Sequence, residues 1–526
     1  MKQFIAKFAD QVDGVLSGWD RLMFRGELCI LYNPGDGGMK QYLKSSSKIL
    51  LKDFGEHVRQ VSGRLKKASL APILEMGRIV QYLAPSVDKS AVAHKIAAEQ
   101  NISSGLVCAI TSVEPCRSFR IVSNRATQHL DLKMERRQCL HIYHYWIDPV
   151  FGWMNARIQT WFPFRIQICL NGREWLARQM DEAGIKYVRA GNCFPWIEDF
   201  DRAQQLMNQQ LEQDWSQVLP AIAKRLNPIH QEIFKRYRVD YYWTTPESEW
   251  AIDVRFPRAE DLKRLYPLML QHGMTAFGST DVMKYLGKRV AADGHLPPGY
   301  EGELFSNIRQ REEGIRIKHY IDGNSLKLYD KVYTEVGNLL RGENTINCVD
   351  GFRVHRPKQG DPQGPSSLRP LRRSEEDLKR RADISHRAVG RYLDGWATVN
   401  DSTRLHEVVD ALERPTHWNQ KRVRGLRVWG TDRVLLETVS HGEFNLNGFR
   451  NRDLQPYLYD SVCSSPEEAR RRSAATGRKL RMLRAHGLIE KLPHSHRYQL
   501  TPSGRLAITA ILVARQTPVS VLAKAA

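Results

Sequence analysis

The stretch SPEEARRRSAATGRKLRMLRAHGLIEKLPHSHRYQLTPSGR, residues Ser465–Arg505, determines how the end of this chain folds. Ser465 and Pro466, followed by two glutamates, are typical of a helix start, because a hydroxyl caps the first amides and carboxylates suit the positive end of the helix dipole. Gly487 suits the C-cap. The helix is predicted to bury a leucine stripe and to expose a strongly basic surface. The stripe comprises Leu480, Leu483 and Leu488, and the basic residues are Arg470, Arg471, Arg472, Arg478, Lys479, Arg481 and Arg484.

Short predicted helices and strands lie before and after this helix, and their order along the chain is informative. Leu488–Leu492 and Arg497–Leu500 are predicted to form two strands around a Pro-His-Ser-His turn. The threonine-proline pair at 501–502 opens a terminal helix, and helical stretches at 432–442 and 448–457 precede the basic helix. Three helices, a hairpin and a last helix form the order of a winged helix-turn-helix.

The segments Leu483–Ile489 and Arg497–Arg505 resemble bacterial winged-helix regulators of the MarR and ArsR type. The resemblance covers only this end of the chain. It implies that the basic helix enters the major groove of DNA and that the hairpin touches the backbone. The alternative is a winged helix that docks a protein, which would need an acidic partner. The residues expected at base edges and phosphates are Arg478, Lys479, Arg481 and Arg484, and those expected in the wing are His494, Ser495, His496 and Arg497.

The composition of the chain indicates a large basic protein with packed cores. Its 526 residues suggest three or four domains, and 42% of them are hydrophobic. Lys and Arg number 79 against 58 Asp and Glu, which gives a net charge of +21. A charge of this size favours a polyanionic partner, most commonly nucleic acid. The alternative is a charge excess that serves solubility alone.

The cysteines and the apolar runs predict a soluble, cytoplasmic protein. The 8 cysteines are scattered without paired short spacings, which favours reduced thiols. The first 16 residues alternate charged with apolar side chains, unlike a signal peptide, and no apolar run reaches the length of a membrane span.

The sequence predicts an α+β multidomain fold, with antiparallel sheets and helices in the body and a winged helix at the C-terminus. Composition shifts and turn-rich stretches mark the boundaries. The predicted regions are 1–115, mainly helical; 116–350, an α+β body; 351–373, a basic Pro/Gly-rich linker; 374–430, a basic helical region; and 431–526, the winged helix.

Three β-type runs, 139–147, 154–162 and 164–170, lie in the first half of the body, and Asn171 is predicted to cap the helix after them. Polar residues on these strands lie among aromatic rings, as in a platform that stacks nucleic-acid bases; the alternative is that the rings are core. The residues are Arg157, Gln159, Arg165, Gln167, Tyr143, Tyr145, Trp153, Trp161 and Phe162. Cys139, His141 and His144 have metal-ligand types, but in a strand His144 faces away from the other two, so no metal site is predicted.

Alternating runs at 315–321, 325–331 and 340–346, with an Asp-Gly turn at 322–323, predict three antiparallel strands. The Tyr-Asp-Lys of Lys327–Lys331 and the Arg-Gly-Glu of 341–343 resemble strands of some plasmid and phage replication initiators. Those enzymes pair two histidines around one apolar residue, whereas His141 and His144 are one position further apart. The resemblance therefore implies nucleic-acid contact more than strand cleavage.

Small-molecule cofactor chemistry is not predicted, because the chain lacks the phosphate-binding, dinucleotide-binding and zinc-protease motifs. Magnesium is expected only if carboxylates converge for phosphodiester cleavage. The carboxylates considered are Asp20, Glu27, Asp253, Asp330 and Glu343, and the weak catalytic candidates are Tyr329, Asp330 and Glu343. A polar cluster is predicted close to the start of the chain, where ion pairing is expected rather than catalysis. Its residues are Asp20, Arg21, Arg25 and Glu27.

Two hypotheses follow for function. The first is a nucleic-acid-binding protein that docks on DNA through the winged helix and has a second contact on its body, such as a structured RNA or the end of a mobile element. The alternative is a mobile-element or replication-type enzyme that cleaves or joins DNA or RNA strands. A scaffold for a ribonucleoprotein is a third hypothesis. Winged-helix regulators are often dimers, but the short terminal helix gives little basis for predicting an oligomer.

Overall fold

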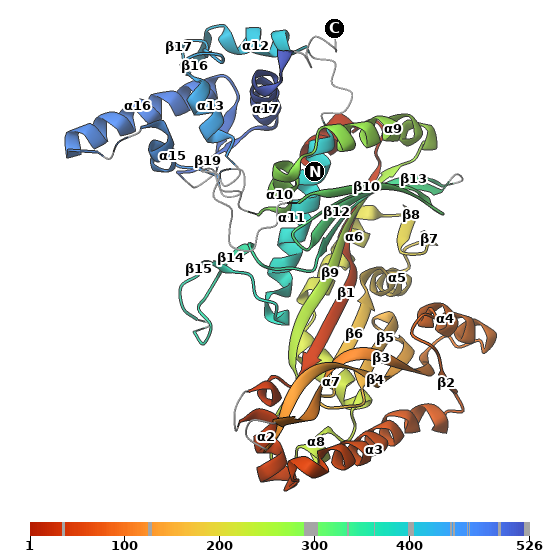
Figure 1. Ribbon diagram of the computed structural model, residues 1–526. Helices are drawn as coiled ribbons and strands as arrows, with labels where there is room; N and C mark the ends of the chain where they lie inside the picture. The colour runs from red at the N-terminus through yellow and green to blue at the C-terminus, as the bar shows by residue number, and fades with distance from the viewer. Residues whose placement is uncertain are drawn as a thin grey trace. The chain divides into compact units, whose positions relative to one another are not determined.

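The computed structural model describes residues 1–519 except 34–36, 125–128, 289–302, 334–335, 362, 398–403, 442–443, 445–447, 460, 462 and 493–495. The chain forms two units, each assembled from separate segments: unit 1 contains Met1–Val12, Glu260–Asp322 and Arg387–Ala526, and unit 2 contains Asp13–Ala259 and Gly323–His386. Helices and strands are both abundant, so the predicted α+β class is confirmed (Figure 1). The units do not follow the five predicted regions, because each joins segments that are distant in sequence.

Unit 2 is built on one large sheet. Its strand order is β12-β13-β9-β1-β6-β5-β4-β3-β2. Neighbouring strands in this order are antiparallel, except that β2 and β3 are parallel. The strands are β1 (Gly14–Glu27), β2 (Ile79–Tyr82), β3 (Gly105–Asn124), β4 (His129–Asp148), β5 (Gly152–Gln159), β6 (Ile166–Asn171), β9 (Tyr242–Phe256), β12 (Asn324–Tyr333) and β13 (Gly337–Ile346). A sheet in the body was predicted; the region 1–115 also contributes β1, β2 and the start of β3 to it, alongside its helices.

The central strand of this sheet is β1. It pairs with β6 on one side and β9 on the other, so its flanks come from residues more than a hundred positions away. Trp19 and Phe24 are buried in the core. The register with β9 shifts between Trp19 and Arg21, a bulge that sets the direction of Asp20.

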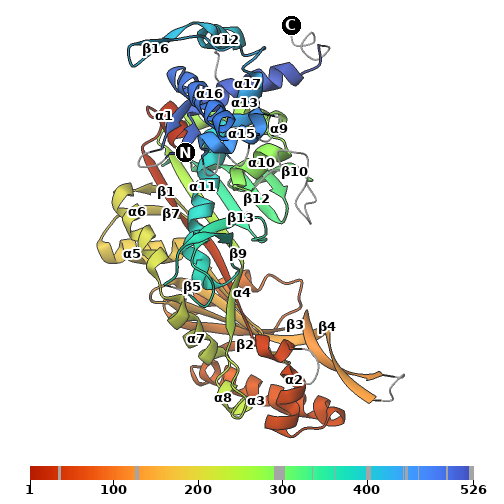
Figure 2. The same cartoon turned by 90° about the vertical axis from the view of Figure 1, so that its left-hand side faces the viewer.

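Helices and a small hairpin cover one face of this sheet. The Asn171 side chain accepts hydrogen bonds from the amides of Arg173 and Glu174, which confirms the predicted cap of α5. Both α5 and α6 pack on β1, and β8 packs on β13 and β9 (Figures 1 and 2). The other elements of unit 2 before β9 are η1 (Cys29–Tyr32), α2 (Gly38–Gln41), η2 (Tyr42–Ser47), η3 (Leu51–Asp53), α3 (Phe54–Glu75), α4 (Lys89–Glu99), α5 (Gly172–Ala183), β7 (Tyr187–Ala190), β8 (Cys193–Ile197), α6 (Phe200–Gln209), η4 (Gln210–Glu212), α7 (Trp215–Leu226) and α8 (His230–Ile233).

The structure adds detail to two predictions about residues 351–430. Within 351–373 the chain forms an antiparallel pair, β14 (Arg353–Arg356) with β15 (Ser367–Pro370), in place of an extended linker. After the turn η5 (Glu375–Asp377), helix α11 (Leu378–Trp396) forms within the predicted basic helical region. Arg381 is buried and donates to Ser248 Oγ and to the carbonyls of residues 245 and 346, so its guanidinium group has hydrogen-bond partners inside the protein.

Unit 1 contains two groups of elements. The first group includes β11, which forms as predicted; after it Asp322 and Gly323 have φ of 49° and 72°, as a type I′ turn requires. The elements are α1 (Lys2–Lys7), α9 (Ala259–Thr275), α10 (Ser279–Leu286), β10 (Phe305–Arg311) and β11 (Gly314–Ile321). The second group is the C-terminal part, residues 404–519, whose buried side chains from Val409 to Ile511 form a core of their own.

The C-terminal part has the predicted helices and hairpin and also an earlier hairpin that the sequence did not predict. That hairpin follows α12 and lies within the region expected to be helical. The elements are α12 (Leu405–Glu413), β16 (Thr416–Trp418), β17 (Lys421–Val423), α13 (Arg433–Val439), α15 (Asn451–Leu458), α16 (Pro466–Ala485), β18 (Ile489–Lys491), β19 (Tyr498–Leu500) and α17 (Pro502–Gln516).

Candidate functional site

Helix α16 has one face fixed in the C-terminal core. The Ser465 hydroxyl accepts a hydrogen bond from the Glu468 amide at 3.2 Å, as an N-cap should. Leu480 and Leu483 are buried, and so is Leu488 just beyond the helix, which matches the predicted apolar stripe. The remaining surface carries seven basic and two acidic side chains. The buried stripe therefore sets which of the basic residues face solvent.

Four arginines of α16, namely Arg470, Arg471, Arg478 and Arg481, are exposed. At about 100° per residue, Arg470, Arg478 and Arg481 fall within about 80° of arc around the helix axis. Within the described part of the chain, none of the four has a hydrogen bond or ion pair. These four residues, called the arginine face below, are free to contact an anion.

Other predicted contact residues are engaged by the protein itself. The Arg484 guanidinium lies 5.0 Å from the ring centroid of Trp418 in β16. In the predicted wing, Arg497 Nη1 donates to the Gly448 carbonyl at 3.1 Å. Lys479 is half-buried, His496 is exposed, and the predicted wing residues at 494 and 495 lie outside the described residues.

Buried Asp432 lies in the same C-terminal part, within range of the positive charge of Lys479. Burial raises its pKa, but hydrogen bonds from the Arg424 side chain and the Arg427 amide outweigh that effect, and the charge of Lys479 adds to them. The net result is a pKa below the ordinary value for aspartate. Lys479 therefore already acts on a carboxylate of its own chain.

A second feature, in unit 2, is a charge network on the face of the sheet that α5, α6 and β8 cover. Arg341 of β13 is fully buried and pairs with Asp20 at 2.7 Å, with Asp253 at 3.1 Å and with Glu343 at 2.7 Å. Burial by itself lowers the pKa of Arg341, yet the surrounding carboxylates raise it well above the ordinary value. The guanidinium therefore stays charged and links three strands.

Lys327 of β12 makes the second link in this network. Its Nζ lies 2.7 Å from Glu249 and 3.0 Å from Glu343, and Thr345 Oγ1 donates to Glu249 at 2.8 Å. These charges overcome the effect of burial and raise the pKa of Lys327. Oxygen atoms of three carboxylates lie within 4.8 Å of one another, close enough to share a metal ion; they belong to Asp20, Glu249 and Glu343.

The covering layer supplies further partners. Arg173 of α5 pairs with Asp253 at 3.1 Å, and its pKa is lowered, chiefly by burial. Asn192, between β7 and β8, donates to both carboxylate oxygens of Asp20. The four carboxylates of the network thus face three cations, Arg173, Lys327 and Arg341, and exposed Arg21 also lies 4.0 Å from Glu249. An arrangement this close to charge balance can hold the strands together.

The structure brings together some of the carboxylates that the sequence suggested for magnesium and separates others. Asp20, Asp253 and Glu343 meet in the network. Glu27 instead pairs with Arg165 at 2.7 Å, and Arg21 pairs with Glu247, so the predicted cluster around residues 20–27 does not form.

Of the catalytic candidates, only Glu343 lies in the network. Tyr329 lies beside it, opposite Arg341 in the register, with Lys331 Nζ 5.0 Å from its ring. Asp330 points to the other face of β12, because neighbouring residues in a strand alternate. The sequence analysis missed the roles of Glu249, Lys327 and Arg173; the only signal was the spacing of two in Arg-Gly-Glu 341–343, which puts both charges on one face of a strand.

The residues predicted to stack nucleic-acid bases, and those of metal-ligand type, make contacts within the protein core. Tyr145 and Phe162 are buried, and Arg157 is held by Glu114 at 2.7 Å, so these groups favour the alternative of a packed core. His144 is buried and bonds Ser69 at 2.9 Å, while His141 bonds the backbone carbonyl of residue 139. The histidines thus have separate partners.

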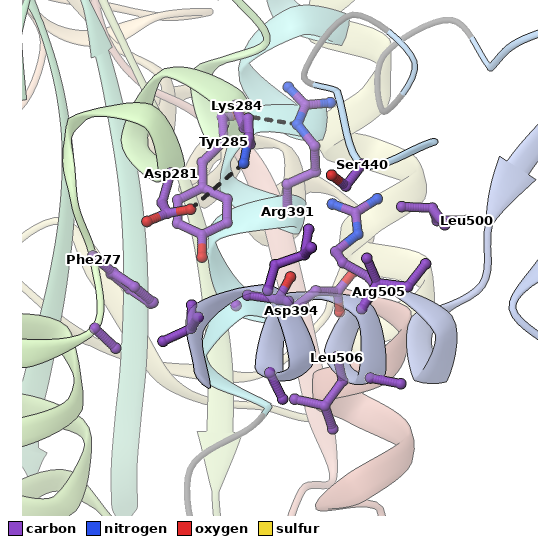
Figure 3. A pocket seen from close by; sticks show the side chains of 18 of the residues that line it. Phe277, Asp281, Lys284, Tyr285, Arg391, Asp394, Ser440, Leu500, Arg505 and Leu506 are labelled. Atoms are coloured by element: carbon purple, nitrogen blue, oxygen red, sulfur yellow. Dashed lines mark hydrogen bonds and ion pairs between the residues drawn. The ribbon is translucent and has the colours of Figure 1, made fainter. Parts of the chain in front are cut away.

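A cavity of about 690 Å³ lies in unit 1 (Figure 3). Its charged groups are largely engaged: Asp394 accepts the amides of residues 3 and 4, and Arg391 Nε donates to the carbonyl of Tyr285 at 2.9 Å. Burial lowers the pKa of Arg505, against the opposing charges of Tyr285 and Asp394. These contacts favour a structural role for the lining residues.

Comparisons of the chain with family models, curated proteins and solved structures gave no match. Among the helices that the structure describes, none combines the length and apolar character needed to cross a membrane.

Proposed function

We propose that this chain binds duplex DNA through its C-terminal part, with residues 404–519 acting as a winged helix-turn-helix. The observation that carries the proposal is the arginine face of α16. A helix whose opposite side is anchored in its own core and whose exposed guanidinium groups have no partner within the described residues suits a negatively charged groove. The net charge of +21 supports a polyanionic partner.

In this proposal Arg478 and Arg481 contact the DNA directly, whereas Arg484 acts from its place on Trp418. Guanidinium groups can donate in pairs to guanine and to phosphates, so the proposal needs no cofactor. The element order of α13, α15, α16, β18, β19 and α17 agrees with it. A structured RNA bound by unit 2 and assembly as an oligomer remain further parts of the hypothesis.

The test is a titration of fluorescent duplex DNA, first a random-sequence pool and then any enriched sequence, at several salt concentrations. The double variant Arg478→Ala, Arg481→Ala should bind more weakly. Its plot of log K against log salt should be less steep by about 2 if both residues contact phosphates. Base contacts instead would appear as a loss of preference for the enriched sequence.

A matched control removes two positive charges from unit 2 through Lys66→Ala and Lys67→Ala on α3, where both side chains are exposed. This control should keep the wild-type affinity. The proposal fails if the arginine variants bind duplex DNA as tightly as the wild type.

A second candidate function is magnesium-dependent cleavage of DNA or RNA strands in unit 2. The observation that favours it is the approach of Asp20, Glu249 and Glu343 to within 4.8 Å, since paired carboxylates can hold the metal that activates water and stabilises the leaving oxygen. Lys327 bridges two of these carboxylates, so a metal would have to share them with its ammonium group.

A nicking assay tests this candidate with supercoiled plasmid and with single-stranded DNA and RNA. Activity should require Mg²⁺ or Mn²⁺ and should be lost in Asp20→Asn. An unfolding midpoint of the variant equal to that of the wild type would show that the variant is folded. A covalent protein-DNA product lost in Tyr329→Phe would indicate a tyrosine nucleophile instead. Absence of any strand break with the wild-type protein, with or without divalent cations, would exclude both mechanisms.

A further inference from the structure

The hairpin of β16 and β17 carries a basic surface beside α16. Its strands pair Thr416 with Val423, His417 with Arg422 and Trp418 with Lys421. The two turn residues, Asn419 and Gln420, have φ of 49° and 63°, which gives the tight primed turn that matches the twist of a hairpin. His417, Lys421 and Arg422 are exposed.

Contacts at its base fix this hairpin to the C-terminal core. Leu426 N–H donates to the carbonyl of Leu412 at 2.9 Å. A Cβ on Gly425 would lie 1.7 Å from the carbonyl oxygen of Glu413, so only glycine allows the two segments to pass this closely. The hairpin is therefore attached where it leaves α12 and where it rejoins the core.

Contacts with α16 hold one side of the hairpin against that helix. The Arg484 guanidinium lies over the Trp418 ring, and His486, just after the helix, bonds the carbonyl of Arg424 at 2.9 Å. Figures 1 and 2 both show β16 beside α16, and residues of the two elements are in contact. The basic surface of the hairpin is thus held next to the helix that carries the arginine face.

We infer that the β16–β17 hairpin is a second, sequence-independent contact to the phosphate backbone of the same DNA duplex. This inference rests on the proposed function of α16. Charge complementarity selects the partner: Lys421 and Arg422 are cations, and within the described residues neither has an ion pair with an acidic side chain. Side chains on a fixed hairpin can reach phosphates that flank the groove without reading bases.

The experiment measures binding of the Lys421→Ala, Arg422→Ala protein to two unrelated DNA duplexes and to a single-stranded RNA over a range of salt concentrations. The expected result is a plot of log K against log salt that is less steep by about 2, because two phosphate contacts are lost, with the same proportional loss of affinity on both duplexes. The Lys66→Ala, Lys67→Ala protein is the control for net charge. Thermal unfolding verifies that the exposed substitutions leave the C-terminal part folded.

Each outcome decides the inference. An unchanged slope in the hairpin variant, with wild-type binding intact and sensitive to Arg478→Ala, Arg481→Ala, overturns the hairpin contact and leaves the proposed function standing. Absence of duplex binding by the wild type overturns both. A loss confined to single-stranded RNA overturns the choice of duplex DNA as partner.

Discussion

The guanidinium group of Arg484 in α16 lies 5.0 Å from the ring centroid of Trp418 in β16, so a helix side chain and a hairpin side chain form one unit. A cation over the face of an indole is attracted by the negative π face of the ring. The arrangement orders both side chains, and it directs the charge of Arg484 along the edge that the hairpin shares with the helix.

A double-mutant cycle with Arg484→Ala and Trp418→Ala measures this coupling. We expect an interaction free energy of about 0.5–1 kcal/mol from urea unfolding of the two single variants and the double variant. The same cycle applied to DNA affinity should give coupling of the same sign, because loss of the ring displaces both Arg484 and the hairpin. Additive effects within error would show that the stacking does not support either element.

Replacement of Arg341 tests the network in unit 2. Arg341→Ala leaves Asp20, Asp253 and Glu343 buried without their shared cation, and breaking a buried ion pair in this way costs about 3–5 kcal/mol of unfolding free energy. Urea unfolding measures the loss. Arg309→Ala on exposed β10 is the control and should change stability by less than about 0.5 kcal/mol. A cost for Arg341→Ala as small as that of the control would show that the carboxylates are solvated.

Buried histidine should make the protein less stable as the pH falls. Burial lowers the pKa of His144 to about 4, while the unfolded chain has the ordinary value near 6.5. The unfolded state therefore binds more protons, and stability that is complete above pH 6.5 is lost as the pH falls toward 4. At pH 5 the loss from this residue is about 2 kcal/mol.

Urea unfolding at pH 7 and pH 5 checks this sign and size. His144→Asn, which removes the titrating ring, should lower the pH-dependent loss between these values by about 2 kcal/mol, whatever its effect at pH 7. The exposed His417→Asn protein should keep the wild-type difference. An equal pH dependence in His144→Asn and the wild type would contradict the burial of the neutral ring.

Glycine at 425 gives a test of how the first hairpin is attached. Gly425→Ala places a methyl group against the Glu413 carbonyl, and the backbone shift that relieves the overlap should cost about 1–3 kcal/mol or more. The nearest atom to a Cβ on Gly430 is 3.6 Å away, so Gly430→Ala should be tolerated. Thermal unfolding of the two variants, followed by DNA titration, separates loss of the hairpin from loss of the whole C-terminal core.

Local signals in the sequence predicted the helices of the C-terminal part well. The Ser465 cap, the leucine stripe and the turn residues act within a few positions, so they can be recognised without knowledge of distant contacts. The same is true of the cap at Asn171 and of the turn at 322–323. The β16–β17 hairpin was missed because its turn, Asn419-Gln420, lacks the glycine that normally marks such a turn, and its strands are only three residues long.

The charge network could be predicted only in part. Acidic residues in strands are visible in the sequence, but their convergence depends on the pairing of β1 with β9, more than 200 positions apart, and of β9 with β13, more than 80 positions apart. Glu249 gave no local sign of its role, and the bulge at Asp20 arises from the pairing itself. Nothing in the pattern around Arg484 indicates that Trp418 would bind it.

The order of synthesis has a consequence for the network around Arg341. Asp20, Glu249 and Asp253 emerge from the ribosome well before β12 and β13, which supply Lys327 and Arg341. Until β13 pairs with β9 and β12 pairs with β13, the central carboxylates have Arg173 as the one buried cation of the network, so they must remain hydrated and the sheet must stay open at that edge. A growing chain can therefore dry the centre of unit 2 only after residue 343 has been made, and a chain that ends earlier would expose both an unpaired strand edge and a surplus of negative charge.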